Sequence, residues 1–343
     1  MTAVVCHNAT DRSATTWHEQ LAPFTALEFA VSDAAKGIAA GLDRLAKQRL
    51  SAGDTTALDR GLDLFHTARE ARTVLARAWH RAESAWTKAL ALDVEVASLQ
   101  RQGQNAQGRS QTATVAWRSA VAEFDDVARQ EAAWRRARAA FDRFDQDGRL
   151  NDRARAEAEI AAALTDLTGA EWKTVRGFLR DRRSTAFLDR IHERLAKAEP
   201  RVEWREAMAW RWWGRHEHPS HSADARTELI RSVAWGRQLT EAERASYAQV
   251  SAVLGSTVRA SSAVECLNSV LRMQQSRHKQ MTQTMLDLKR LYWNCHRLKS
   301  GKRKGGCPYE HLGLPLRSCD FWTLLQADPQ RLTQELSGQQ DAQ

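Results

Sequence analysis

The chain has 343 residues, enough for one large domain or two of ordinary size with a substantial core. Its 51 Lys and Arg residues exceed its 42 Asp and Glu residues, and the net charge of +9 favours a polyanionic partner. No apolar run approaches the roughly 18 residues that a membrane-spanning helix needs, and no targeting segment opens the sequence, so we expect a cytoplasmic protein without a membrane contact.

The composition predicts a mainly helical protein with reduced thiols. Six prolines and 17 glycines stand against abundant Ala, Leu, Arg and Glu, which favour helices. The five cysteines are an odd number and include no Cys-x-x-Cys pair, so we interpret them as free thiols and not as a zinc site.

The first predicted elements are a strand, a helix and a second short strand. Residues 27–32 (LEFAVS) are the best strand candidate, and Asp33 follows them, just before the helical run AAKGIAAGLDRLAKQRL. Residues 61–66 (GLDLFH) form a second short apolar segment. An acid at the carboxyl end of a buried strand lies where α/β folds bind ligands, although a plain helix N-cap also explains Asp33.

From residue 67 to residue 255 nearly the whole chain is predicted to be helical. The polar segment 100–111 predicts a hairpin-like turn, and the segment 145–152 (DQDGRLND) predicts another break. The first long helix has one apolar face, made by Leu75, Trp79, Trp86 and Leu90. The tryptophans farther along the region are expected in the core of a helical bundle, with stacking on DNA bases as the alternative.

The most informative stretch is residues 261–314. It contains Glu265-x-x-Asn268-x-x-x-Arg272, a long amphipathic helix, the basic loop HRLKSGKRK (residues 296–304) and the closing motif PYEHLGL (residues 308–314). Together these features resemble the last segment of a bacterial insertion-sequence DDE transposase catalytic domain. Farther upstream, AVSDAAKGIAAGL resembles the second acidic motif of the same family.

The resemblance implies a mainly α protein with a partial RNase H-like α/β catalytic domain. One or two strands are retained, and a large helical insertion interrupts the domain. The implied organisation is a lead-in, a partial RNase H-like segment, a helical insertion, a C-terminal catalytic segment and a frayed tail. Their residues are 1–26, 27–66, 67–255, 256–325 and 326–343, respectively.

The family's chemistry is metal-dependent cleavage and strand transfer of DNA phosphodiesters. The resemblance implies that Asp33 and Glu265 bind Mg²⁺ or Mn²⁺, with Asn268 and Arg272 on the same helix face as Glu265. It also places His66 near the site. Two simpler interpretations stay open: Ser262-x-x-Glu265 also fits a capping box, and His66 also fits a structural histidine at a strand end.

Basic residues near the C-terminal end predict contacts with the DNA backbone, although solvated basic loops are common. The residues are Arg277, Lys279, Arg297, Lys299, Lys302, Arg303 and Lys304.

The first acid of such a site has no clear counterpart, because Asp11 lies in the turn-like segment NATDRSATT. We therefore expect the first catalytic strands to be absent and the isolated chain to be inactive. Its partners would be DNA and another copy of itself or a full-length transposase. The alternative is a non-catalytic helical DNA-binding or assembly protein derived from a transposase.

Overall fold

The computed structural model describes residues 11–337, except residues 26, 33–34, 55–57, 217–226, 228–233, 235–238, 258–281, 300–303 and 315. The chain divides into two compact units: Trp17–Ser262, and Met1–Thr16 together with Ala263–Gln343. The described residues are mainly helical, as the sequence predicts. None of the described helices combines the length and the apolar character needed to span a bilayer.

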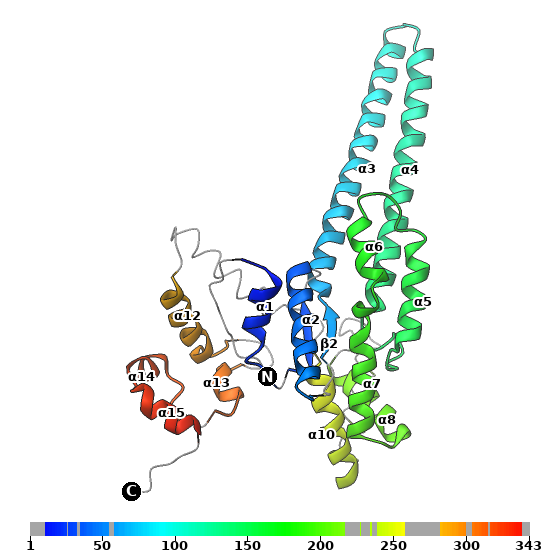
Figure 1. Ribbon diagram of the computed structural model, residues 1–343. Coiled ribbons are helices and arrows are strands. Elements are labelled where there is room, and N and C mark those ends of the chain that lie inside the picture. Colours follow the sequence, from blue (N-terminus) through cyan, green and yellow to red (C-terminus); the bar gives the residue numbers. More distant parts are fainter. Residues whose placement is uncertain are drawn as a thin grey trace. The chain divides into compact units, whose positions relative to one another are not determined.

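The larger unit begins with a β-α-β arrangement after α1 (Ala14–Leu21), the helix in which the two units divide (Figure 1). The strands β1 (Phe29–Ser32) and β2 (Asp59–Leu62) pair in parallel, residue by residue from Phe29 opposite Asp59 to Ser32 opposite Leu62. Between them runs α2 (Lys36–Ser51), which buries Leu42 and Leu45. Because parallel strands need a crossover connection, α2 makes this pairing possible.

The second strand differs from the sequence prediction. It begins at Asp59 and ends at Leu62, whereas the apolar pattern predicted a strand to His66. The side chain of Asp63 accepts a hydrogen bond from the backbone N–H of Phe65 at 2.8 Å and so caps the next helix. His66 therefore lies in the first turn of that helix and not in a strand.

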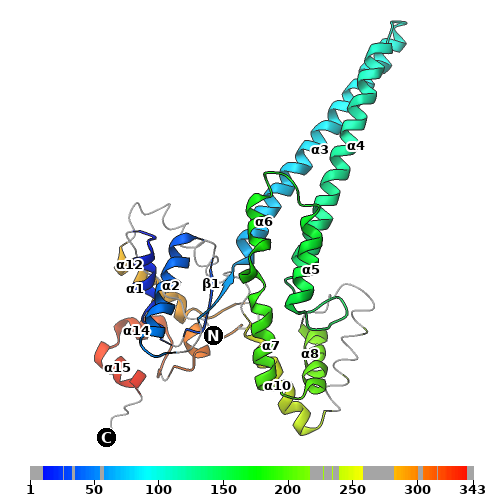
Figure 2. The same ribbon diagram turned by 45° about the vertical axis from the view of Figure 1, so that its right-hand side comes forward.

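A long antiparallel hairpin of α3 (Leu64–Arg101) and α4 (Gln107–Ala139) follows (Figure 2). Its turn lies within the predicted segment 100–111, where Gly103 takes a left-handed φ of 69°. Small side chains form the seam, which lets the two helices approach closely. The buried alanines of the seam are Ala71, Ala78, Ala82, Ala89, Ala113, Ala120, Ala133 and Ala137.

The predicted apolar face of α3 is only partly buried, because the alanines take the seam. Trp79 and Leu75 pack against a small core of Ala78, Ala82 and Val127. Trp86 and Leu90, by contrast, are exposed.

The other helices of the larger unit pack around the base of the hairpin (Figures 1 and 2). They are α5 (Arg153–Leu164), α6 (Lys173–Arg180), a 3-10 turn (Arg182–Ser184), α7 (Ala186–Ala198), α8 (Val202–His216) and α10 (Glu241–Gly255). Their shared core contains Trp172, Trp212 and Trp213, which are 0%, 2% and 6% exposed. These three tryptophans are therefore packing residues.

An ion pair at the end of α7 predicts a pH dependence of stability. The carboxylate of Glu199 accepts hydrogen bonds from Arg201 Nε and Nη2 at 2.8 and 2.7 Å, and this pairing lowers the pKa of Glu199 from 4.5 to about 2. Because the folded-state pKa lies below the unfolded value, the stabilisation is complete above pH 4.5 and is lost as the pH falls towards 2. We expect Glu199→Gln to lower the urea midpoint at pH 7, and the difference from wild type to shrink over that window.

Urea unfolding followed by far-ultraviolet circular dichroism at a series of pH values measures the effect. Glu193→Gln, which removes an exposed acid from the same helix, is the control and should leave the midpoint unchanged at each pH. A difference between wild type and Glu199→Gln that stays constant down to pH 2 would contradict the assignment.

The smaller unit contains four short helices among its described residues: α12 (Gln283–Cys295), α13 (Pro308–His311), α14 (Phe321–Gln326) and α15 (Pro329–Ser337). The expected frayed tail over residues 326–343 differs from the structure at α15. Pro329 opens that helix, and the Asp328 side chain accepts a hydrogen bond from the backbone N–H of Gln330 at 2.7 Å.

Candidate functional site

The carboxyl edge of the two-stranded sheet lies next to His66, one of the sequence-predicted site residues. β1 ends at Ser32 and β2 at Leu62, and the backbone N–H of Asp63 donates to the carbonyl of Ser32 at 2.8 Å. The residue after Ser32 is Asp33, which lies outside the described residues. The parallel pairing nevertheless brings the chain positions just after both strands to one edge.

Asp63 is a residue at this edge that the sequence reasoning missed. It is 2% exposed, and its Oδ1 accepts the capping hydrogen bond from Phe65. Its Oδ2 lies 3.7 Å from Nε2 of His66. The signal was in the sequence, since LDLFH repeats the strand-Asp-helix order that singled out Asp33. The described part of this edge thus holds a carboxylate and an imidazole side by side.

The carboxylate of Asp63 stabilises the fold. One oxygen of Asp63 stabilises the start of α3, and the other faces His66, which would orient the imidazole ring if that ring binds a ligand. Carboxylate oxygens are the ligands that Mg²⁺ and Mn²⁺ prefer. The described donors at this edge are the carboxylate of Asp63, which already caps α3, and the imidazole of His66.

The base of the basic loop forms a second candidate site, in the smaller unit. The backbone N–H of Leu298 donates to Gly306 O at 3.0 Å, and that of Gly305 donates to Leu298 O at 2.8 Å. Gly305 has a left-handed φ of 87°, which a residue with a side chain rarely adopts. The two arms of the loop are therefore closed at their base, and the side chains of Lys299 and Lys304 beside it are exposed.

The guanidinium of Arg297 connects this loop to the closing motif, residues 308–314. Its Nη1 donates to Gly305 O at 2.7 Å, and its Nη2 forms a short ion pair with Oε1 of Glu310. The other oxygen of Glu310 accepts from the backbone N–H of Cys307 at 3.0 Å, completing a capping box on α13. Arg297 was predicted to contact DNA, and this stays a prediction, since the side chain that holds the loop is also exposed.

Three thiols of the smaller unit, those of Cys295, Cys307 and Cys319, lie near one another. Burial raises the pKa of Cys295 to about 11, and burial together with the neighbouring Cys307 raises that of Cys319 to about 11. All three cysteines are free. Over the described ranges, no cluster of three His, Cys, Asp or Glu side chains has an arrangement able to hold a metal ion.

The remaining predicted site residues lie outside the described residues. They are Asp33, Glu265, Asn268, Arg272, Arg277, Lys279, Lys302 and Arg303. His66 and Asp63 belong to the larger unit, and Arg297, Lys299 and Lys304 belong to the smaller one.

Comparisons with protein-family models, with curated proteins and with solved structures found no match to this chain. The functional interpretation therefore depends on the residues themselves and on the resemblance of their motifs.

Proposed function

We propose that this chain acts in DNA transposition as a DDE-type transposase. The observation that carries the proposal is the parallel β1-α2-β2 arrangement, in which β1 leads directly into Asp33 and β2 into Asp63. An RNase H-like catalytic domain needs a strand that delivers an acid to a sheet edge. The motifs around Glu265 and the basic loop supply the family's other expected features.

In this proposal Asp33 and Glu265 hold Mg²⁺ or Mn²⁺. The bound ion supplies Lewis-acid stabilisation of charge on a phosphodiester and activation of the attacking oxygen. Arg272 and the lysines of the basic loop hold the DNA backbone. Asp63 and His66 position the edge that carries Asp33.

The test is Mn²⁺ binding by the purified chain, measured by isothermal titration calorimetry. We expect wild-type protein and Glu83→Gln, a control that removes an exposed acid from α3, to bind Mn²⁺ with the same affinity. Asp33→Asn and Glu265→Gln should each weaken Mn²⁺ binding while leaving DNA affinity unchanged, because each removes one metal ligand and leaves the basic residues in place. Unchanged Mn²⁺ affinity in both variants would overturn the metal-site assignment.

A second candidate is a DNA-binding or assembly protein without catalytic activity. The contacts of Arg297 with Gly305 and Glu310 favour this function. They close the loop beside Lys299 and Lys304, and the proposed metal ligands take no part in them. Plasmid binding by a wild-type chain that does not bind Mn²⁺ would support this function over the first.

Salt dependence of DNA affinity measures the contribution of the loop. Removal of one lysine that neutralises a phosphate should lower the slope of log K against log salt by about 0.9 for duplex DNA. We therefore expect Lys299→Ala and Lys304→Ala each to lower the slope by about one unit. Lys197→Ala, at an exposed position of α7, should not change it. An unchanged slope in the double variant of Lys299 and Lys304 would remove the loop from the interface.

A further inference from the structure

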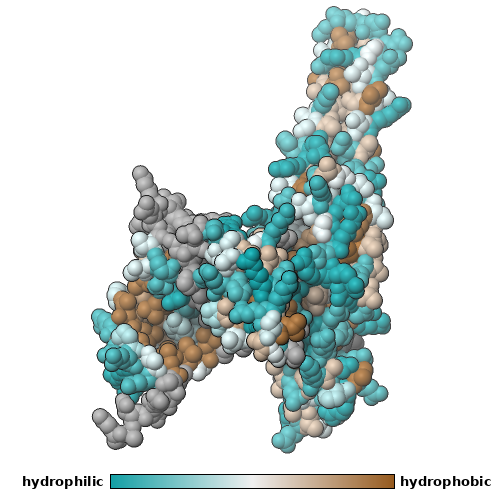
Figure 3. Space-filling view, in the orientation of Figure 1, coloured by the Kyte–Doolittle hydropathy of each residue, from teal (hydrophilic) through white to brown (hydrophobic). Residues whose placement is uncertain are grey.

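The outer part of the α3–α4 hairpin extends beyond the helices that pack at its base (Figures 1 and 2). It exposes large apolar side chains. Trp86, Leu90 and Val94 of α3 are 41%, 47% and 65% exposed, and Val115 and Val121 of α4 are 63% and 48% exposed. Figure 3 shows such hydrophobic residues among hydrophilic ones along the hairpin. Grouped apolar side chains on a surface are typical of an interface.

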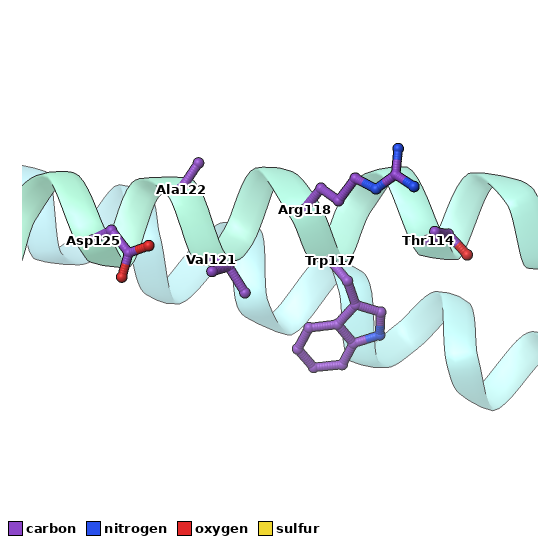
Figure 4. Close-up of a pocket in the computed structure, with 6 residues that line it drawn as sticks. All are labelled: Thr114, Trp117, Arg118, Val121, Ala122 and Asp125. Carbon is purple, nitrogen blue, oxygen red and sulfur yellow. The ribbon is translucent and has the colours of Figure 1, made fainter.

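A shallow pocket on α4 lies within this region, and Figure 4 shows the residues that line it. We call this surface the α4 patch; its residues are Thr114, Trp117, Arg118, Val121, Ala122 and Asp125. They recur at the three- and four-residue spacing of one helix face. The patch is therefore a continuous stripe of about three turns.

The apolar surface continues from α4 onto α3. The rings of Trp117 and Trp86 meet edge to face with their centroids 4.7 Å apart. Nε1 of Trp117 donates to Oδ2 of Asp93 at 2.6 Å, which fixes the indole at the side of the patch. The indole is thus held in place as part of a formed surface.

The α4 patch carries two opposite charges. Arg118 and Asp125 lie on either side of Val121 and Ala122 (Figure 4). Neither forms an ion pair with another residue of the described chain, whereas nearby charges on the hairpin do, such as Arg109 with Glu95. The patch therefore carries one positive and one negative group whose attractions are not used within the described part of the molecule.

The positions of these charges are symmetrical. The point halfway along the helix between Arg118 and Asp125 falls between the apolar residues Val121 and Ala122. A two-fold axis through that midpoint pairs α4 with an antiparallel α4. It places each arginine beside the aspartate of the other copy and the small apolar residues against each other. A surface that complements itself in this way is the property of an isologous dimer interface.

We propose that the α4 patch binds a second copy of this chain in an antiparallel, two-fold arrangement that pairs Arg118 of each copy with Asp125 of the other. Burial of the apolar side chains supplies the affinity. The two charge pairs set the register and the choice of partner. The two hairpins together form a four-helix bundle. This inference does not rest on any activity towards DNA.

The test is a charge swap, measured by sedimentation equilibrium of the full chain. We expect the wild type to dimerise, and Arg118→Asp and Asp125→Arg each to raise the dimer dissociation constant at least tenfold, because each brings like charges together. The double variant Arg118→Asp/Asp125→Arg restores opposite charges and should return to within about threefold of wild type by the same complementarity argument.

Lys88→Asp is the matched control, since it makes the same change of charge on α3 two residues from Trp86 and therefore on another side of that helix. It should leave dimerisation unchanged. Far-ultraviolet circular dichroism should show the same helicity in every variant, because both patch charges are exposed. A wild-type chain that stays monomeric, a dimer insensitive to the single changes, or a double variant weaker than both singles would each overturn the proposal.

Discussion

Replacement of Trp172 by alanine is expected to lower the free energy of unfolding of the larger unit by about 3–5 kcal/mol. The side chain is fully buried among the helices at the base of the hairpin. Its Nε1 also donates to Oε1 of Gln130 at 2.8 Å, and Gln130 itself is 3% exposed. The change leaves a cavity and also deprives the buried amide oxygen of Gln130 of its donor, so both effects act in the same direction.

A conservative change separates the two effects. Trp172→Phe keeps most of the ring but removes the N–H, so it should cost only the unpaired amide and a small volume, about 1–3 kcal/mol. Val202→Ala, at an exposed position at the start of α8, should change stability by less than about 0.5 kcal/mol. Urea unfolding followed at 222 nm measures all three. A cost below about 1 kcal/mol for Trp172→Ala would show that the site collapses around the cavity.

Local sequence signals predicted the elements of the fold well where one short segment decides the outcome. The apolar run LEFAVS predicted β1 to within two residues, and the glycine-containing segments 100–111 and 145–152 predicted two turns. The limits of β2 were missed because Asp63 fits both a strand and a helix cap. In the structure its side chain accepts a hydrogen bond from the backbone N–H of Phe65, so Asp63 caps α3 and β2 ends at Leu62.

The packing of the hairpin was harder to predict because its seam is made of alanines. A periodicity of large apolar residues favoured Trp86 and Leu90 as the buried face of α3. Alanine contributes little to such a pattern, yet its small size allows the closest approach of two helices. The large residues therefore lie at the edge of the seam, where they form the exposed surface beside the α4 patch.

The role of each basic residue in the loop of residues 296–304 was also hard to predict from the sequence. A count of charges in HRLKSGKRK predicts DNA contacts for every basic residue alike. The structure distinguishes Arg297, which is exposed but ion-paired with Glu310, from Lys299 and Lys304, which are exposed and show no ion pair among the described residues. The partner lies in the closing motif, and no local pattern links the two residues. The roles of Asp33 and Glu265 rest on their motifs, since both lie outside the described residues.

Gly148→Ala is expected to destabilise the larger unit by about 2–5 kcal/mol. Gly148 lies in the turn before α5 with φ of 77°, and a Cβ there would clash with Cε3 of the Trp213 indole. The left-handed backbone costs about 1–2 kcal/mol for a residue with a side chain. The clash costs about 1–3 kcal/mol more, since Trp213 is held in the core and has little room to move.

Gly53→Ala isolates the clash from the backbone strain. Gly53 has nearly the same φ, 81°, but no atom lies within 4 Å of its added Cβ. Its substitution should therefore cost the strain alone, about 1–2 kcal/mol. The difference between the two variants in urea unfolding measures how tightly Trp213 closes over the turn. Equal costs would mean that the indole moves aside, and that the turn of residues 145–152 is not part of the packed core.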